Sequence, residues 1–169
     1  MILLRVIAML LLLGLLPGCA SVRELWPFGR EPAGPAPDLE QGLSVADTET
    51  VVAFYERAQT FYGRLAHRRF NDISTYRDEQ LRDYFRSEAA FSDYYAGLAQ
   101  ALAEAHFERN RPLTLDVVEF RLAGPGEAEV VTRMVGENGL PLRRGNTDLE
   151  RTDRWERLQG TWWIIPGKL

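Results

Sequence analysis

The spacing of apolar residues changes once along the chain, from the period of an amphipathic helix to the alternation of a β-strand. Between residues 47 and 67, apolar side chains recur every three or four positions, which predicts a helix with one buried, aromatic-rich face. Ser44 and Asp47 stand before this segment, and both are favourable N-cap residues. The predicted buried stripe consists of Val51, Tyr55, Ala58, Tyr62 and Leu65, widened by Phe54 and Phe61.

Two more helices are predicted before the period changes. The polar residues 68–77 form a connection, and residues 78–85 form a short helix. Ser87 is a favourable cap for the next helix, which ends near Asn110 because Pro112 keeps the residue before it out of the helical conformation. The apolar stripe of this helix consists of Phe91, Tyr95, Leu98, Leu102 and Ala105.

Alternating residues after Pro112 predict antiparallel strands. Residues 117–122 form a half-buried strand with Val118, Phe120 and Leu122 on its apolar side. The further predicted elements are a turn at residues 124–126, a strand over 128–135, a long loop over 136–148, and a hairpin of strands 149–158 and 161–165.

The closing hairpin turns at Gln159 and Gly160, a pair that favours a tight turn less strongly than Asn-Gly. With a two-residue turn, Trp155 lies opposite Ile164, and successive side chains alternate between the two faces of the sheet. One face then carries Asp153, Trp155, Arg157, Trp162 and Ile164, and the other carries Trp163 and Ile165.

Helices followed by antiparallel strands predict an α+β domain over residues 45–169, in which N-terminal helices cover one face of a curved antiparallel sheet. This order, closed by a strand, a turn and a tryptophan-rich strand that ends at Pro166, resembles the NTF2-like (cystatin-like cone) superfamily. The resemblance covers residues 45–166. One departure is that no clear strand is predicted between the second and third helices, where many members have one.

The N-terminal residues have the pattern of an export signal. Arg5 precedes the uncharged apolar residues 6–16, a run too short for a permanent membrane span of about 20 residues. Leu16, Gly18 and Cys19 resemble a bacterial lipoprotein signal. The resemblance implies that a signal peptide of residues 1–18 is removed and that Cys19 is acylated. An ordinary cleaved signal and an uncleaved anchor are the alternatives.

This lipoprotein resemblance also implies a cellular location. Ala20 after the acylated cysteine, in place of aspartate, implies sorting to the outer membrane of the bacterial cell envelope, facing the periplasm. Residues 19–44 hold four of the nine prolines and are predicted to tether the domain. A flexible chain of this length has an r.m.s. reach of roughly 25–30 Å.

Composition excludes some functions. Cys19 is the only cysteine, so its acylation leaves no thiol for a disulfide or for nucleophilic catalysis. The net charge is −4, with acidic and basic residues interspersed, whereas binding to nucleic acid calls for a basic face. His67 and His106 are isolated and are predicted to lie at helix C-termini, so neither a metal site nor a cofactor motif is predicted.

The NTF2-like resemblance implies a place for chemistry, because members include isomerases and cyclases that hold an acid and a tyrosine in the mouth of the cone. The corresponding pair here would be a carboxylate of raised pKa that meets a phenol in an apolar pocket. The alternative is that the tyrosines belong to the core and the acids to solvated strand faces. The candidate pocket residues are Tyr55, Tyr62, Asp116, Glu119, Asp153 and Trp155.

Contacts with a partner are predicted in two places. The loop over residues 136–148 contains adjacent arginines flanked by leucines, a composition that suits a protein partner or a lipid headgroup. Two adjacent tryptophans on the last strand point to opposite faces, and an exposed tryptophan beside arginines is typical of a binding hot spot. The candidate contact residues are Arg143, Arg144, Trp162 and Trp163.

From these features we expect a membrane-anchored envelope lipoprotein whose domain is a non-catalytic binding or interaction module for an unidentified protein or small ligand. A homodimer through the outer face of the sheet is an open alternative. So are a small-molecule enzyme of the isomerase or hydrolase type and a purely structural envelope lipoprotein.

Overall fold

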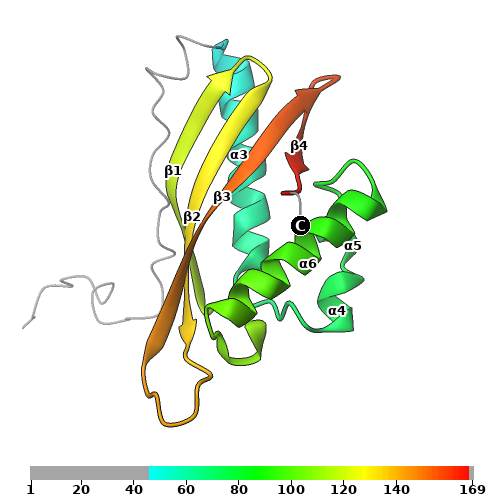
Figure 1. Cartoon of the computed structure of the whole chain (residues 1–169). Helices are drawn as coiled ribbons and strands as arrows, with labels where there is room; N and C mark the ends of the chain where they lie inside the picture. The colour runs from blue at the N-terminus through cyan, green and yellow to red at the C-terminus, as the bar shows by residue number, and fades with distance from the viewer. Residues whose placement is uncertain (1–45, 168–169) are drawn as a thin grey trace, which may run out of the picture. The chain divides into compact units, whose positions relative to one another are not determined.

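The computed structural model describes residues 46–167. Within this range the helices precede the strands, and the strands form one antiparallel sheet in the order β1-β2-β3-β4 (Figure 1). The predicted α+β class is therefore confirmed. The expected signal peptide, Cys19 and the expected tether lie outside the described residues.

Helix α3 (Thr48–Leu65) begins at the predicted cap. The Asp47 carboxylate accepts a hydrogen bond from the backbone N–H of Thr50 at 2.8 Å, which satisfies one of the free donors of the first turn. Tyr55, which we expected within the buried stripe, is half-buried at its edge. The apolar residues that α3 buries are Val51, Phe54, Ala58, Phe61, Tyr62 and Leu65.

Two single-turn helices follow α3. Helix α5 (Glu79–Arg82) lies inside the predicted short helix, whereas α4 (Ile73–Tyr76) occupies part of the segment that we expected to be a connection. Asp72 and Asp78 cap these turns, and each accepts a hydrogen bond from the backbone N–H two residues on, at 2.8 and 3.0 Å. Because an aspartate cap stabilises one turn without any apolar period, the hydrophobic pattern did not reveal α4.

Helix α6 (Glu88–Glu104) begins at Ser87, whose hydroxyl accepts a hydrogen bond from a backbone N–H of the first turn at 3.1 Å. It ends well before the predicted end, because His106 adopts a left-handed φ of 60° and a 3₁₀ turn, η2 (Glu108–Asn110), follows. Its buried residues are Phe91, Tyr94, Leu98 and Leu102, so Tyr94 takes the central place that we predicted for the half-buried Tyr95.

The sheet is longer than the alternation of apolar residues indicated. Pairing between the second and third strands continues through Gly136 and Glu137, so the loop between them shrinks from the predicted 136–148 to residues 138–145. Backbone hydrogen bonds do not depend on apolar side chains, which is why the polar ends of these strands escaped prediction. The strands are β1 (Thr114–Gly124), β2 (Glu127–Glu137), β3 (Asn146–Leu158) and β4 (Thr161–Ile165).

A β-bulge in β1 changes which valine faces the core. The register of β1 against β2 shifts between Val117 and Glu119, so Val117 is buried and Val118 is 49% exposed. The prediction that Val118 shares the apolar side with Phe120 and Leu122 is therefore wrong. An extra residue in one strand reverses the alternation on one side of the bulge.

The closing hairpin has the predicted register. Gln159 and Gly160 both adopt positive φ angles, 51° and 83°, as the central residues of a two-residue hairpin turn do. Trp155 pairs with Ile164 and Leu158 with Thr161, which confirms the expected placement of side chains on the two faces.

Helices α3 and α6 pack against the same face of this twisted sheet (Figure 1). Their buried residues form one cluster with side chains of all four strands. Aromatic rings dominate the contact, since Phe54 of α3 lies 5.8 Å from the ring of Trp155 and 4.8 Å from the ring of Trp162. The space between helices and sheet is thus filled by aromatic side chains.

Candidate functional site

A buried carboxylate, Asp153 on β3, is the centre of a polar network inside this core. Its Oδ2 accepts hydrogen bonds from the hydroxyls of Tyr62 on α3 and Tyr94 on α6, at 3.1 and 3.0 Å. Its Oδ1 accepts a hydrogen bond from Nε of Arg151 at 2.7 Å. The indole N–H of Trp155 donates to the Tyr62 hydroxyl at 3.1 Å. Two helices and one strand therefore meet at one carboxylate.

Strand geometry explains how β3 supplies three of these residues. Positions 151, 153 and 155 alternate along β3, so Arg151, Asp153 and Trp155 all face the helices. The guanidinium of Arg151 also lies over the ring of Tyr94, 4.7 Å from its centroid. Arg151 is half-buried, and it forms the outer edge of the network.

The two phenols act as donors throughout the neutral pH range. Burial raises the pKa of Tyr62 well above its ordinary value, and the negative charge of Asp153 and the neighbouring Tyr94 raise it further. Burial, followed by the charge of Asp153, likewise raises the pKa of Tyr94. Both hydroxyls therefore keep their protons and point them at the carboxylate.

The other predicted pocket residues lie away from this network. Asp116 and Glu119 lie on the outer side of β1, where Asp116 is opposite Arg133 and Glu119 forms an ion pair with Arg121 at 2.7 Å. The ring of Tyr55 packs 4.9 Å from that of Phe120. The structure thus brings together three of the six predicted residues, Tyr62, Asp153 and Trp155.

The residues that sequence reasoning missed in this network are Tyr94 and Arg151. Tyr94 precedes Tyr95 on α6, and either tyrosine fits the stripe begun by Phe91. Arg151 could have been identified from the sequence, because it lies two residues before Asp153 on a predicted strand and therefore on the same face of the sheet.

The two adjacent tryptophans of β4 differ in their exposure to solvent. Trp162 is 1% exposed and belongs to the core, so the prediction that it contacts a partner is wrong. Trp163 is half-buried on the outer face, with the guanidinium of Arg57 at 5.5 Å from its ring. Arg57 in turn donates to the backbone carbonyls of Trp162 and Asp83, both at 2.7 Å, and ties α3 to β4.

Two hollows of about 390 and 360 Å³ flank Arg86, next to β4. Arg86 lines both, and its guanidinium forms an ion pair with Glu156 at 3.1 Å. Leu158 and Trp163 line one hollow and Ile165 the other. We call Arg86, Leu158, Trp163 and Ile165 the Arg86 surface; neither of its hollows is lined by a residue of the Asp153 network.

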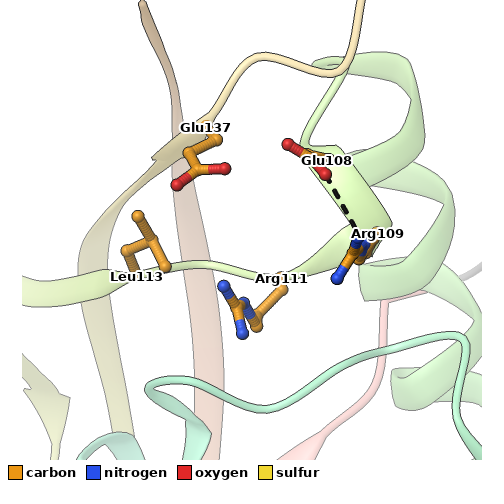
Figure 2. A pocket seen from close by; sticks show the side chains of 5 residues that line it. All are labelled: Glu108, Arg109, Arg111, Leu113 and Glu137. Carbon is orange, nitrogen blue, oxygen red and sulfur yellow. Dashed lines mark ion pairs between the residues drawn. The ribbon is translucent and has the colours of Figure 1, made fainter.

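A smaller, strongly polar pocket of about 150 Å³ lies beside η2 (Figure 2). Glu108 and Arg109 of η2 form an ion pair at 3.4 Å, and Arg111, Leu113 and Glu137 complete the lining (Figure 2). Arg109 and Glu137 are exposed and Glu108 and Arg111 are half-buried, so the charged groups of this pocket keep contact with solvent.

The loop over residues 138–145 presents the other predicted contact residues. Arg143 and Arg144 are exposed, and neither belongs to any ion pair found among residues 46–167. Leu142 beside them is 103% exposed.

The part of the chain that the structure describes was also searched for metal sites and membrane spans. It holds no group of three histidine, cysteine, aspartate or glutamate side chains that could bind a metal ion. None of its helices is both long and apolar enough to cross a membrane.

Comparison of the chain with protein-family models, with curated proteins and with solved structures finds no match.

Proposed function

We propose that the protein is a lipid-anchored component of the bacterial cell envelope whose NTF2-like domain binds a partner through the Arg86 surface and catalyses no reaction. The lipoprotein pattern ending at Cys19 supports the anchor, and the order of helices and strands supports the NTF2-like type. The observation that carries the non-catalytic role is the state of Asp153. This acid is 3% exposed and already accepts three hydrogen bonds.

A general base must reach a proton of its substrate at hydrogen-bond distance. Asp153 would first have to lose its contacts with Tyr62, Tyr94 and Arg151, in a space that aromatic rings fill. The network is better suited to hold α3 and α6 on the sheet than to turn over a substrate.

The Arg86 surface has the composition of a binding site. Tryptophan and arginine are enriched among the residues that contribute most to the affinity of protein interfaces. Here Trp163 and Arg86 lie near the exposed Leu158, and shallow hollows on both sides of Arg86 offer space for side chains of a partner. This surface lies along β4 at the edge of the sheet, where Ala90 of α6 also lines one of the hollows.

The enzymatic alternative draws on the same Asp153–Tyr62 pair, which is the acid and phenol that an isomerase or hydrolase would need. It requires the core to open. A variant Asp153→Asn that stays folded but loses a biological activity retained by Arg86→Ala would favour the enzyme over the binding module.

Two measurements test the proposal. The first is incorporation of radiolabelled palmitate by the native chain and by Cys19→Ser; label in both or in neither contradicts the anchor. The second places a photo-crosslinking amino acid at Leu158 in the anchored protein, with the same amino acid at the exposed Glu150 of β3 as the control. We expect a discrete adduct from position 158 alone, and an adduct with twice the mass of the mature anchored chain would identify a second copy as the partner.

A further inference from the structure

The tip of the β2–β3 hairpin presents an apolar side chain in the position least protected from water. Leu142 is 103% exposed, the highest value among the exposed large apolar residues of the described chain. It also adopts a left-handed φ of 69°, which is unfavourable for a residue with a Cβ atom. The backbone conformation of Leu142 is thus unfavourable, and burial of its side chain within the domain does not offset this cost.

Hydrogen bonds hold this tip in one conformation. The backbone N–H of Asn138 donates to the carbonyl of Gly145 at 3.0 Å and closes the loop. Within the loop, the N–H of Arg143 donates to the carbonyl of Leu140 at 3.2 Å, and the N–H of Leu140 donates to Oδ1 of Asn138 at 2.9 Å. The N–H of Gly139 reaches the carbonyl of His106 at 2.8 Å, which fastens the loop to the turn after α6. Leu142 is therefore presented by a preformed loop.

The charged residues within the loop itself are both basic. Arg143 and Arg144 follow it directly, are exposed, and belong to no ion pair among residues 46–167. Along the chain the nearest acidic residues are Glu137 and Asp148, at the two bases of the loop, and Asp148 is already paired with Arg133 at 3.2 Å. In space Glu108 also lies against the base of the loop, beside Gly139, and it is paired with Arg109 at 3.4 Å. A chain of net charge −4 thus carries a local positive tip.

We propose that this tip, residues 138–145, is an interfacial contact for an anionic phospholipid bilayer. Leu142 enters the headgroup region while Arg143 and Arg144 bind lipid phosphates. An exposed apolar side chain supplies burial in the interface, and adjacent basic side chains supply attraction to anionic lipids. The inference rests on the proposed function, since the bilayer concerned is the one that holds Cys19.

The contact is compatible with the predicted tether. The tip lies at the end of the hairpin remote from the start of α3 (Figure 1). Strand β2 of 11 residues spans about 37 Å at about 3.4 Å per residue. This exceeds the r.m.s. reach of the tether, roughly 25–30 Å, but is well below its fully extended length of roughly 85 Å. Once a chain is anchored, a weak contact is sufficient, because the tether keeps the effective concentration of the tip at the membrane high.

The test uses unacylated mature chain, residues 19–169 with Cys19→Ser, and vesicles of phosphatidylcholine with or without phosphatidylglycerol. This chain keeps every core residue, since the core of the described range consists of residues 51–164. We expect sedimentation with the phosphatidylglycerol vesicles that weakens as salt rises. The pair Arg143→Gln and Arg144→Gln should lower partitioning roughly tenfold or more. Leu142→Ser should lower it several-fold.

Matched controls carry the same changes elsewhere. The pair Arg77→Gln and Arg154→Gln removes the same charge from exposed positions outside the tip, and Val118→Ser replaces an exposed valine on β1. We expect these variants to bind as the parent chain does and all variants to keep the circular dichroism spectrum of the parent. Residues 19–45 are identical throughout, so differences between variants report on the domain.

The proposal would be overturned if the tip variants and the control variants partitioned equally. It would also be overturned if the folded parent chain did not bind vesicles, or if its binding did not depend on phosphatidylglycerol. A tip that instead crosslinks to an acidic protein in the envelope would also overturn it, in favour of a protein partner. These outcomes are separate from those of the proposed function, because palmitate labelling at Cys19 and crosslinking at Leu158 do not involve the tip.

Discussion

Tyr62 and Tyr94 donate hydrogen bonds to the same carboxylate oxygen, Oδ2 of Asp153, at 3.1 and 3.0 Å. They come from different helices, and their separations from Asp153 along the chain are 91 and 59 residues. One buried atom thereby links α3 and α6 to β3. Because a buried acceptor left without donors costs more than the hydrogen bond itself contributes, this link holds the helices in a single place on the sheet.

The two tyrosines should differ in what their hydroxyls contribute to stability. The Tyr62 hydroxyl donates to Asp153 and also accepts from the indole N–H of Trp155. Among residues 46–167, the Tyr94 hydroxyl has a single hydrogen bond, the one to Asp153. We expect Tyr94→Phe to lower the free energy of unfolding by about 1–2 kcal/mol and Tyr62→Phe by about 2–3 kcal/mol. Urea unfolding of both variants measures the difference. Equal losses would mean that the bond from Trp155 contributes nothing.

Stability should fall at alkaline pH because of the same pair. Burial and the charge of Asp153 raise the pKa of Tyr62 and Tyr94 above the ordinary 10.0, so the unfolded chain releases these protons at a pH where the folded chain keeps them. Their contribution is complete below pH 10 and is lost as pH rises toward the folded-state pKa. Urea midpoints between neutral and alkaline pH check this, with absorbance of tyrosinate at 295 nm recorded in parallel.

In that experiment Tyr94→Phe serves as the control, since it removes one of the two groups and should flatten the alkaline slope. Ionisation of all six tyrosines in the folded protein, before any loss of its circular dichroism signal, would contradict the burial of Tyr62 and Tyr94.

Gly136 on β2 should not tolerate a methyl group. A Cβ atom there would lie 2.6 Å from Cδ1 of the buried Phe107 and 2.9 Å from the backbone carbonyl oxygen of Arg111. We expect Gly136→Ala to destabilise the protein by about 1–3 kcal/mol through overpacking. Gly63→Ala, inside α3 with nothing within 4 Å of the new atom, should instead stabilise it by about 0.5–1 kcal/mol. Thermal unfolding of the two variants should shift in opposite directions.

The closing turn offers a stabilising substitution. Gln159 adopts a φ of 51°, a left-handed conformation that asparagine tolerates better than glutamine, and it precedes a glycine as the favoured Asn-Gly turn requires. Gln159→Asn should therefore raise the thermal midpoint, by a free energy of about 0.5 kcal/mol. Gln159→Val, whose branched side chain opposes this φ, should lower it. A midpoint that is insensitive to both changes would show that the turn does not limit stability.

The sequence predicted those features that depend on neighbouring residues. Asp47 and Ser87 cap helices because their side chains reach a backbone N–H three residues on, and the pairing of Trp155 with Ile164 follows from a two-residue turn. Local chemistry also indicated that Asp153 and Trp155 share a face of β3. None of these inferences requires knowledge of another part of the chain.

Other features were missed because a local pattern allows two outcomes. Tyr94 and Tyr95 both lie close to the stripe of α6, and the position of the sheet decides that Tyr94 enters the core. The bulge at Val118 likewise depends on how β1 pairs with β2. Three of the six candidate pocket residues were wrong for the same reason. Alternation alone would place Asp116 and Glu119 on opposite faces of β1, and the bulge between them puts both on the outer face, away from the helices.

By itself, then, the sequence determined the α+β order, the capped starts of α3 and α6 and the closing hairpin, because each element is set by residues close together in the chain. The tertiary structure alone decided that Tyr62, Tyr94 and Arg151 converge on Asp153 and close the core around it. It also decided that the Arg86 surface and Leu142 remain outside. The physical reason is that hydrogen bonds and burial act across distances in space, and residues far apart along the chain meet only when helices and strands pack together.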